Sequence, residues 1–329
     1  MRVHLFAGMA ATALATALAT ALAGAAHAQC SPAVQKLVTD HKFDEARAEV
    51  RTLLAKNDKD DAALHCMGIT YMEQDDSKHA EDWFEKAVAA NDKSSAHHLW
   101  LGNSIGDQAQ HASKFKQPFM ARRVKSEFER AVELDPTSVD ARTGLIQFYS
   151  MAPGFMGGSM DKAKEQAREI EKTSLWRGHR EMGSLLEHDK DIAGAEKEFQ
   201  ASVAAAPDSG APYNALAGFF RRQKRWDDAL ATYENLLKHR PDLVTAHLAM
   251  ASVLNSAGQD PARMERETRV WLAAPPADAS KLNFSAAHYF LGQVAEKQGK
   301  RDVAKAEYQQ SLTFNPGNND AKKALDNVK

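Results

Sequence analysis

The segment WDDALATYENLL, residues 226–237, carries the pattern that decides the fold prediction. In it, Ala229 is followed four residues later by the aromatic Tyr233. Residues four apart lie on the same face of an α-helix, one turn from each other, so the pair marks one face of a helix. The same pairing occurs in HAEDWFEKAV (79–88), AGAEKEFQAS (193–202) and RDVAKAEYQQSL (301–312).

This pairing belongs to a repeat whose basic period is 34 residues. The alanine position extends to a column at residues 46, 80, 124, 163, 195, 229, 263 and 304. Twelve residues before the column stand Gly68, Gly183, Ala217, Ala251 and Gly292, with Gly102 in an expanded second unit. Twelve residues after it stand Pro136, Pro207, Pro241, Pro275 and Pro316. Small side chains let two antiparallel helices approach closely, aromatics fill the flanking gaps, and proline ends the second helix.

The order resembles the tetratricopeptide repeat family, with its pattern W-x2-L-G-x2-Y, A-x3-F and P. The matching residues are Leu64, Met67, Gly68, Tyr71, Ala80, Phe84 and Ala87 in the first full repeat, and Tyr213, Leu216, Ala217, Phe220, Ala229, Tyr233 and Pro241 in a later one. The resemblance covers nearly all of residues 31–329. It implies an all-α, right-handed α-solenoid of antiparallel helix pairs over residues 29–329, with about seven full repeats and a partial N-terminal one.

Two departures from the pattern affect the prediction. The repeat around Arg263 has Arg263, Glu267 and Val270 where an alanine, an aromatic and a small residue are expected, so its second helix is the least well supported. Insertions near residues 109–123 and 276–283 are expected to lie in connections, where solenoids tolerate added length.

The N-terminus predicts export. Met1 and Arg2 precede an uncharged Ala/Leu/Thr-rich stretch and then GAAHA, which is typical of a secretory signal peptide over residues 1–28, cleaved after Ala28. We therefore expect a periplasmic protein of a Gram-negative-type cell. No later stretch is apolar throughout for about 18 residues, so no membrane insertion of the mature chain is expected.

Charge and cysteine content narrow the function. Without residues 1–28 the chain keeps 41 Lys and Arg against 44 Asp and Glu, a net charge of −3, which argues against a nucleic-acid binder. The two cysteines, Cys30 and Cys66, are compatible with a disulfide in an oxidising compartment and equally with two free thiols. Gln29 disfavours a lipid anchor at Cys30, because lipoprotein signals need a small residue directly before the cysteine.

The segment FYSMAPGFMGGSMDKA (148–163) raises the question of a ligand-binding loop. In the repeat register, the distance from Tyr149 to Ala163 is five residues longer than from Tyr71 to Ala80, which indicates a lengthened turn between two helices. It lacks the Lys-Ser/Thr of a phosphate-binding loop, and Ser159 or Asp161 is expected to cap the next helix. The segment resembles an insertion shared by a group of exported bacterial tetratricopeptide proteins without an assigned reaction. The alternative is a loop over residues 153–160 that binds an anionic small molecule, in a binding protein or an enzyme.

The resemblance also implies a concave groove lined by the first helix of each repeat. Carried onto this chain, its lining positions are Asn103, Gln147, Arg177, Arg180, Ser184, Asn214, Arg221 and Arg222. Arginine binds carboxylates with two donors, and asparagine can pair with a peptide backbone. The expected function is a non-catalytic scaffold or adaptor that holds an acidic or extended segment of another protein. The alternative for the arginines is a solvated basic face balanced by nearby acids.

No catalytic or metal site is predicted. The chain has thirteen histidines but no H-E-x-x-H, and the adjacent His97 and His98 point about 100° apart on a helix. Two isolated cysteines cannot complete a structural zinc site by themselves. No Ser/His/Asp set or carboxylate pair stands out from a charged helical background, so neither a cofactor nor a metal is expected.

Overall fold

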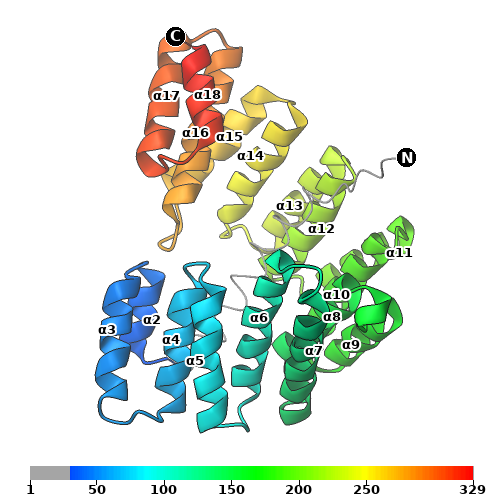
Figure 1. Cartoon of the computed structure of the whole chain (residues 1–329). Helices are drawn as coiled ribbons and strands as arrows, with labels where there is room; N and C mark the ends of the chain where they lie inside the picture. Colours follow the sequence, from blue (N-terminus) through cyan, green and yellow to red (C-terminus); the bar gives the residue numbers. More distant parts are fainter. Residues whose placement is uncertain (1–29, 329) are drawn as a thin grey trace. The chain divides into compact units, whose positions relative to one another are not determined.

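The computed structural model describes residues 30–328, and all of its regular structure is helical (Figure 1). The expected signal peptide, residues 1–28, lies outside the described residues. The chain divides into two compact units, which meet in sequence at Ser174 and Leu175. We call them unit 1 and unit 2. Each helix packs chiefly against its neighbours in sequence, so the predicted all-α class and the stacking of helix pairs are confirmed.

Unit 1 holds the first helices of the chain. They are α2 (Pro32–Thr39), α3 (Phe43–Leu54), α4 (Asp61–Met72), α5 (Ser77–Ala90), α6 (Ser95–His111), α7 (Gln117–Leu134), α8 (Val139–Met151) and α9 (Met160–Thr173), with the 3-10 turn η1 (Gly154–Met156) between the last two. Successive helices run side by side in alternating directions (Figure 1).

Within unit 2, successive helices also alternate in direction (Figure 1). Its helices are α10 (Leu175–His188), α11 (Ile192–Ala205), α12 (Gly210–Arg222), α13 (Trp226–His239), α14 (Thr245–Ala257), α15 (Pro261–Ala273), α16 (Lys281–Lys297), α17 (Arg301–Phe314) and α18 (Asn319–Asn327).

The small residues of the repeat lie where two helices of a pair cross. A Cβ atom on Gly68 of α4 would lie 2.5 Å from the ring of Phe84 in α5. On Gly292 of α16 it would lie 2.4 Å from the ring of Tyr308 in α17. Both distances are far below van der Waals contact, so only glycine lets these helices approach to this separation.

The alanine column is buried as predicted at seven of its eight positions. These are Ala46, Ala80, Val124, Ala163, Ala195, Ala229 and Ala304, all at most 5% exposed. The prediction that residue 263 holds the buried position of its helix is wrong by one residue. In α15 the inward positions are Met264, Thr268 and Trp271, each at most 1% exposed, whereas Val270 is 44% exposed.

One extra residue in the preceding turn causes this shift. Gly258 ends α14 in the left-handed conformation (φ 68°), and Asp260 caps α15 by accepting a hydrogen bond from the Arg263 amide. Pro261 then begins the helix, a position where its missing amide costs no hydrogen bond. The helix that the sequence supported least, α15, therefore forms, and it begins with both an N-cap residue and a proline.

The insertion near residues 109–123 corrects a second expectation. It was expected in a connection, but most of it extends α6 to His111 and begins α7 at Gln117, which leaves only residues 112–116 between the helices. Pro118 in the first turn of α7 is compatible with this early start. The insertion near residues 276–283 does lie mostly in the connection between α15 and α16.

Cys30 and Cys66 form a disulfide, with their Cα atoms 5.6 Å apart. It joins the residue before the N-cap of α2 to the middle of α4. Both cysteines are buried in a cluster that also contains Val34 of α2, Val50 of α3 and Met67 of α4. The bond therefore ties the first helix to the repeat on which it packs.

Candidate interaction site

A hollow of about 350 Å³ lies in unit 1, between α6, α7, α8 and the turn that contains η1. Its apolar wall comes chiefly from Ala121, Val124 and Phe128 of α7 and Phe148 of α8. Gly106 of α6 also lines it, and a Cβ there would meet only Val124, 3.8 Å away. Small residues on α6 and α7 thus leave room that larger side chains would fill.

Two of the predicted groove residues, Asn103 of α6 and Gln147 of α8, line this hollow. Both side chains are half-buried. Among residues 30–328 neither carboxamide has a hydrogen-bonding partner, whereas nearby Gln117 donates to the Ala109 and Ala112 carbonyls, 3.2 Å away in each case. Asn103 and Gln147 therefore keep donors and acceptors available beside an apolar hollow.

The glycine-rich turn closes one side of the hollow through Pro153 and Met156. Its backbone amides from Met156 to Ser159 all donate to carbonyls of the chain: Met156 and Gly158 to Pro153, Gly157 to Gly154, and Ser159 to Tyr149. Gly157 has φ 101°, a conformation that favours glycine. An anion-binding loop needs free amides pointing at the ligand, and these four are already used.

Ser159 caps α9 by accepting a hydrogen bond from the Lys162 amide, 3.4 Å away. Tyr149 of α8 precedes the turn and donates to Oε1 of Glu129, 3.1 Å away. Burial, and then the Glu129 carboxylate, raises the pKa of Tyr149 to about 12. The phenol therefore stays protonated at neutral pH and holds α8 against α7.

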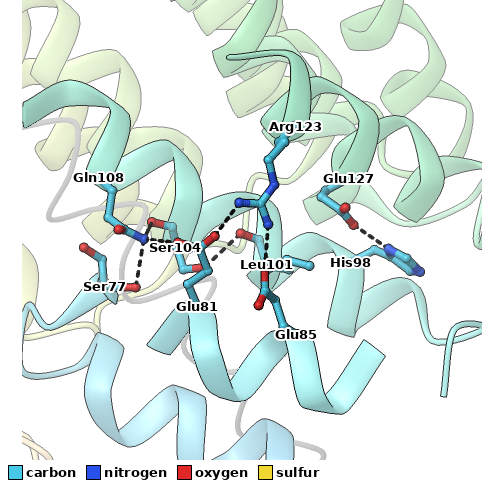
Figure 2. A network of polar contacts seen from close by, with 9 residues as sticks. All are labelled: Ser77, Glu81, Glu85, His98, Leu101, Ser104, Gln108, Arg123 and Glu127. Atoms are coloured by element: carbon cyan, nitrogen blue, oxygen red, sulfur yellow. Dashed lines mark hydrogen bonds and ion pairs between the residues drawn. The ribbon is translucent and has the colours of Figure 1, made fainter. Parts of the chain in front are cut away.

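A polar network fixes α6 and α7 against the preceding repeat (Figure 2). The guanidinium of Arg123 in α7 donates to Glu81 and Glu85 of α5, at 2.6 and 2.7 Å. Gln108 of α6 donates to the Glu81 carboxylate at 2.6 Å and to the Ser77 carbonyl at 3.2 Å. The helices that form the hollow are thus positioned by charged hydrogen bonds as well as by apolar packing.

The other six predicted groove residues belong to unit 2. Arg222 pairs with Glu187 through two hydrogen bonds of 2.9 and 2.7 Å. Arg180 pairs with Glu181, whose side chain is buried. Two arginines that were expected to attract an acidic partner are therefore already neutralised by carboxylates of the same unit.

The remaining unit 2 positions differ in their surroundings. The guanidinium carbons of Arg177 and Arg180 lie 5.3 and 5.5 Å from the centre of the Trp176 ring, within cation–π range. Ser184 donates to the Arg180 carbonyl, and Arg221 to the Ser256 hydroxyl, 3.4 Å away. Asn214 is exposed on α12.

Sequence reasoning missed four exposed apolar side chains around the hollow: Phe115, Phe119, Met151 and Phe155. We call them the apolar tips. The signal that was available is that Phe115, Phe119 and Phe155 fall in the two insertions of unit 1, outside the packing column. An aromatic residue without a column position has no repeat partner to cover it.

Known protein families and solved structures support the repeat geometry. Residues 213–243 and residues 285–318 each match a family profile described as tetratricopeptide repeat. The chain is a tetratricopeptide repeat protein. As a member of that family it belongs among protein-interaction scaffolds.

The fold of this tetratricopeptide repeat protein is similar to that of several solved structures. One is yeast Tom70, with TM-score 0.65 and 13% identity, over 99% of this chain and 66% of the Tom70 chain, just under two thirds of its length. Another is a tetratricopeptide repeat protein from Parabacteroides merdae, with TM-score 0.46 and 12% identity, over 80% of this chain and 97% of that one. At these identities the likeness concerns the fold alone.

No curated protein matches the sequence of this chain. Over residues 30–328, every helix is too short or too polar to cross a membrane.

Proposed function

We propose that this protein is a non-catalytic scaffold that holds an extended segment of another protein at the hollow of unit 1. The observation that carries the proposal is the position of Asn103 and Gln147, which lie on the first helices of neighbouring repeats and offer unused carboxamides beside an apolar hollow. Ligand sites commonly combine an apolar wall with a few convergent polar groups.

The chemistry of the hollow fits a peptide. An extended backbone presents amides and carbonyls in alternation, and a carboxamide can donate to one and accept from the other. The volume of about 350 Å³ and the wall around Val124 and Phe128 suit one large apolar side chain of the partner. Two polar anchors and one apolar anchor would fix the register of a bound segment.

The arginines of unit 2 are proposed as a second contact, for acidic residues of the partner. Because Arg180 and Arg222 already pair with Glu181 and Glu187, an acidic segment would have to compete with these internal carboxylates. The gain for each new ion pair is therefore small, and we place the main contact in unit 1.

The proposed location is the periplasm, after cleavage of residues 1–28. The disulfide between Cys30 and Cys66 supports an oxidising compartment, because such bonds rarely persist in a reducing cytosol. It lies just after the proposed cleavage point and would form once the chain is exported.

The alternative function, binding of an anionic small molecule by residues 153–160, is not favoured. The amides of Met156, Gly157, Gly158 and Ser159 are occupied by hydrogen bonds within the chain. A thermal-shift measurement with inorganic phosphate and nucleotides tests it. A ligand at 100 times its Kd would raise the free energy of unfolding by about 2.7 kcal/mol, and no shift is expected.

Site-specific photocrosslinking in the source cell tests the scaffold. A benzophenone amino acid is placed at Gln110, on the edge of the hollow, and as a control at Lys197, exposed on α11. The expected result is one protein adduct from position 110, absent from position 197 and lost when Gly106→Leu fills the hollow. Equal adducts in the Gly106→Leu variant would refute binding at this site.

A further inference from the structure

The apolar tips of unit 1 lie on the two turns that border the hollow, or in the helix ends next to these turns. Phe115 is 89% exposed and Phe155 is 82% exposed. Phe119 and Met151 are 70% and 69% exposed. The other large hydrophobic residues that are exposed among residues 30–328 are spread over unit 2, at Leu175, Val270, Leu282 and Val303, and only Leu282 exceeds 60%.

The two turns lie next to each other. Gln110 and Gln117, on either side of the turn that carries Phe115, line the same hollow as Pro153 and Met156, on either side of Phe155. Contacts between α7 and η1 place the glycine-rich turn against the helix that begins directly after Phe115 and Lys116. Because both turns border the same hollow, we treat the apolar tips as one surface.

Cations flank Phe115 and Phe119 in the sequence. Residues 108–126 contain no aspartate or glutamate but five lysines and arginines. Arg123 and Lys125 pair with glutamates of α5 and α7. Lys114, Lys116 and Arg122 are exposed, and within the described part of the chain no carboxylate lies within ion-pair distance of them.

We propose that this surface docks on an anionic lipid bilayer, with the phenylalanines of the two turns entering the interfacial region and Lys114, Lys116 and Arg122 contacting lipid headgroups. The proposal does not depend on the proposed function of the hollow. It describes attachment at the membrane surface, because the helices described cannot span a bilayer. A protein exported to the periplasm would meet such a surface.

The chemistry favours a bilayer over a protein partner for these side chains. A pocketed partner would have to supply separate cavities for Phe115 and Phe155, whereas a bilayer interface accepts apolar side chains without matching their shape. Each lysine or arginine near an anionic leaflet raises the partition coefficient about fivefold. Apolar insertion together with three cations is the combination that interfacial binding requires.

Vesicle sedimentation tests the proposal. The chain beginning at Gln29 is used, because residues 5–23 would themselves partition into lipid. With vesicles of phosphatidylethanolamine and phosphatidylglycerol we expect binding that weakens as salt is raised. Binding to pure phosphatidylcholine vesicles should be at least tenfold weaker. A Phe115→Trp probe should shift its fluorescence to the blue on the anionic vesicles only.

Matched variants separate the surface from general adhesion. Phe115→Ser with Phe155→Ser, and Lys114→Gln with Lys116→Gln and Arg122→Gln, should each lower the partition coefficient at least tenfold. Leu282→Ser and the triple change Lys197→Gln, Lys224→Gln, Lys238→Gln in unit 2 should leave it unchanged. Circular dichroism checks that every variant keeps its helices.

Three outcomes would overturn the proposal. They are the absence of binding to anionic vesicles, equal binding to both lipid compositions, and equal loss of binding in the unit 2 controls. The protein could instead fail to bind vesicles but self-associate in sedimentation velocity. If the Phe115→Ser and Phe155→Ser double variant lost this association, the surface would be assigned to binding of a second copy of the protein.

Discussion

Nδ1 of His98 in α6 lies 2.6 Å from Oε2 of Glu127 in α7 (Figure 2). The histidine stands four residues before the crossing glycine, and the glutamate directly precedes the aromatic residue that packs on it. The same pairing recurs at His179 and Glu198, His247 and Glu267, and His288 and Glu307, at 2.6 to 2.7 Å. Two helices of one repeat are thus joined by a polar contact beside their apolar crossing.

The stabilising effect of His98 should depend on pH. Its hydrogen bond to Glu127, opposed by burial, raises the pKa of His98 above the ordinary value of 6.5. A raised pKa in the folded state stabilises it fully below about pH 6.5, and this contribution is lost as the pH rises through the folded-state pKa. In urea unfolding, His98→Gln should therefore cost about 1 kcal/mol more near pH 6 than near pH 9.

The control for His98 is Glu127→Gln, which keeps the shape of the side chain but removes its charge. It should flatten the pH dependence in the same way as His98→Gln. Burial lowers the pKa of the adjacent His97, an effect of opposite sign, so each variant is compared with the parent chain at every pH. An equal cost of His98→Gln at both pH values would contradict the assignment.

Adding a methyl group at a helix crossing should destabilise the chain. Gly292→Ala places a Cβ 2.4 Å from the Tyr308 ring, and relieving this overlap is expected to cost about 1–3 kcal/mol. Gly106→Ala, where the nearest atom is 3.8 Å away, should instead be neutral or stabilising by about 0.5–1 kcal/mol. Hydrogen exchange of α16 and α17 measures the first change. Unchanged exchange there would show that the tight crossing is not required.

Removing the disulfide should loosen one end of the chain only. Cys30 and Cys66 are 36 residues apart. A disulfide that closes a loop of this length lowers the entropy of the unfolded chain, which raises the free energy of unfolding by about 3–4 kcal/mol. Because repeats contact mainly their neighbours, Cys30→Ser with Cys66→Ser should speed hydrogen exchange in α2, α3 and α4 but not in α8 or α9. Uniformly faster exchange over unit 1 would argue against this local role.

The buried part of the fold could be predicted because it is periodic. Phe84, Phe128, Phe199, Tyr233 and Tyr308 are all buried, as their common position in the repeat indicated. The same reasoning placed Arg263 inward by assuming a fixed period. A single added residue in the turn before α15 moves Met264 to that position, and no column of spacings reveals where in a turn a residue has been added.

The candidate site was only partly predictable. Asn103 and Gln147 followed from their places in the repeat, but the hollow beside them depends on how two insertions fold, and insertions have no repeat partner to define them. The ion pair of Arg222 with Glu187 could have been predicted from the sequence. Glu187 precedes it by 35 residues, close to one period, and such residues face each other on successive first helices.

The two parts of the proposed contact can be separated by paired substitutions. Asn103→Ala with Gln147→Ala removes the free carboxamides of unit 1, and Arg180→Ala with Arg221→Ala removes two cations of unit 2. We expect the first pair to weaken crosslinking from position 110 at least tenfold, because each lost hydrogen bond is worth about 1 kcal/mol. The second pair should have a smaller effect, since Arg180 already pairs with Glu181.

Helix content and melting separate loss of binding from loss of folding. Asn103 and Gln147 have no hydrogen-bonding partner within residues 30–328, so their removal should leave thermal stability unchanged. Arg180→Ala leaves the buried Glu181 without its partner and should lower stability, a cost that such changes commonly carry. If the unit 2 pair weakened crosslinking more than the unit 1 pair at a temperature where both variants stay folded, the main contact would belong to the arginines and not to the carboxamides.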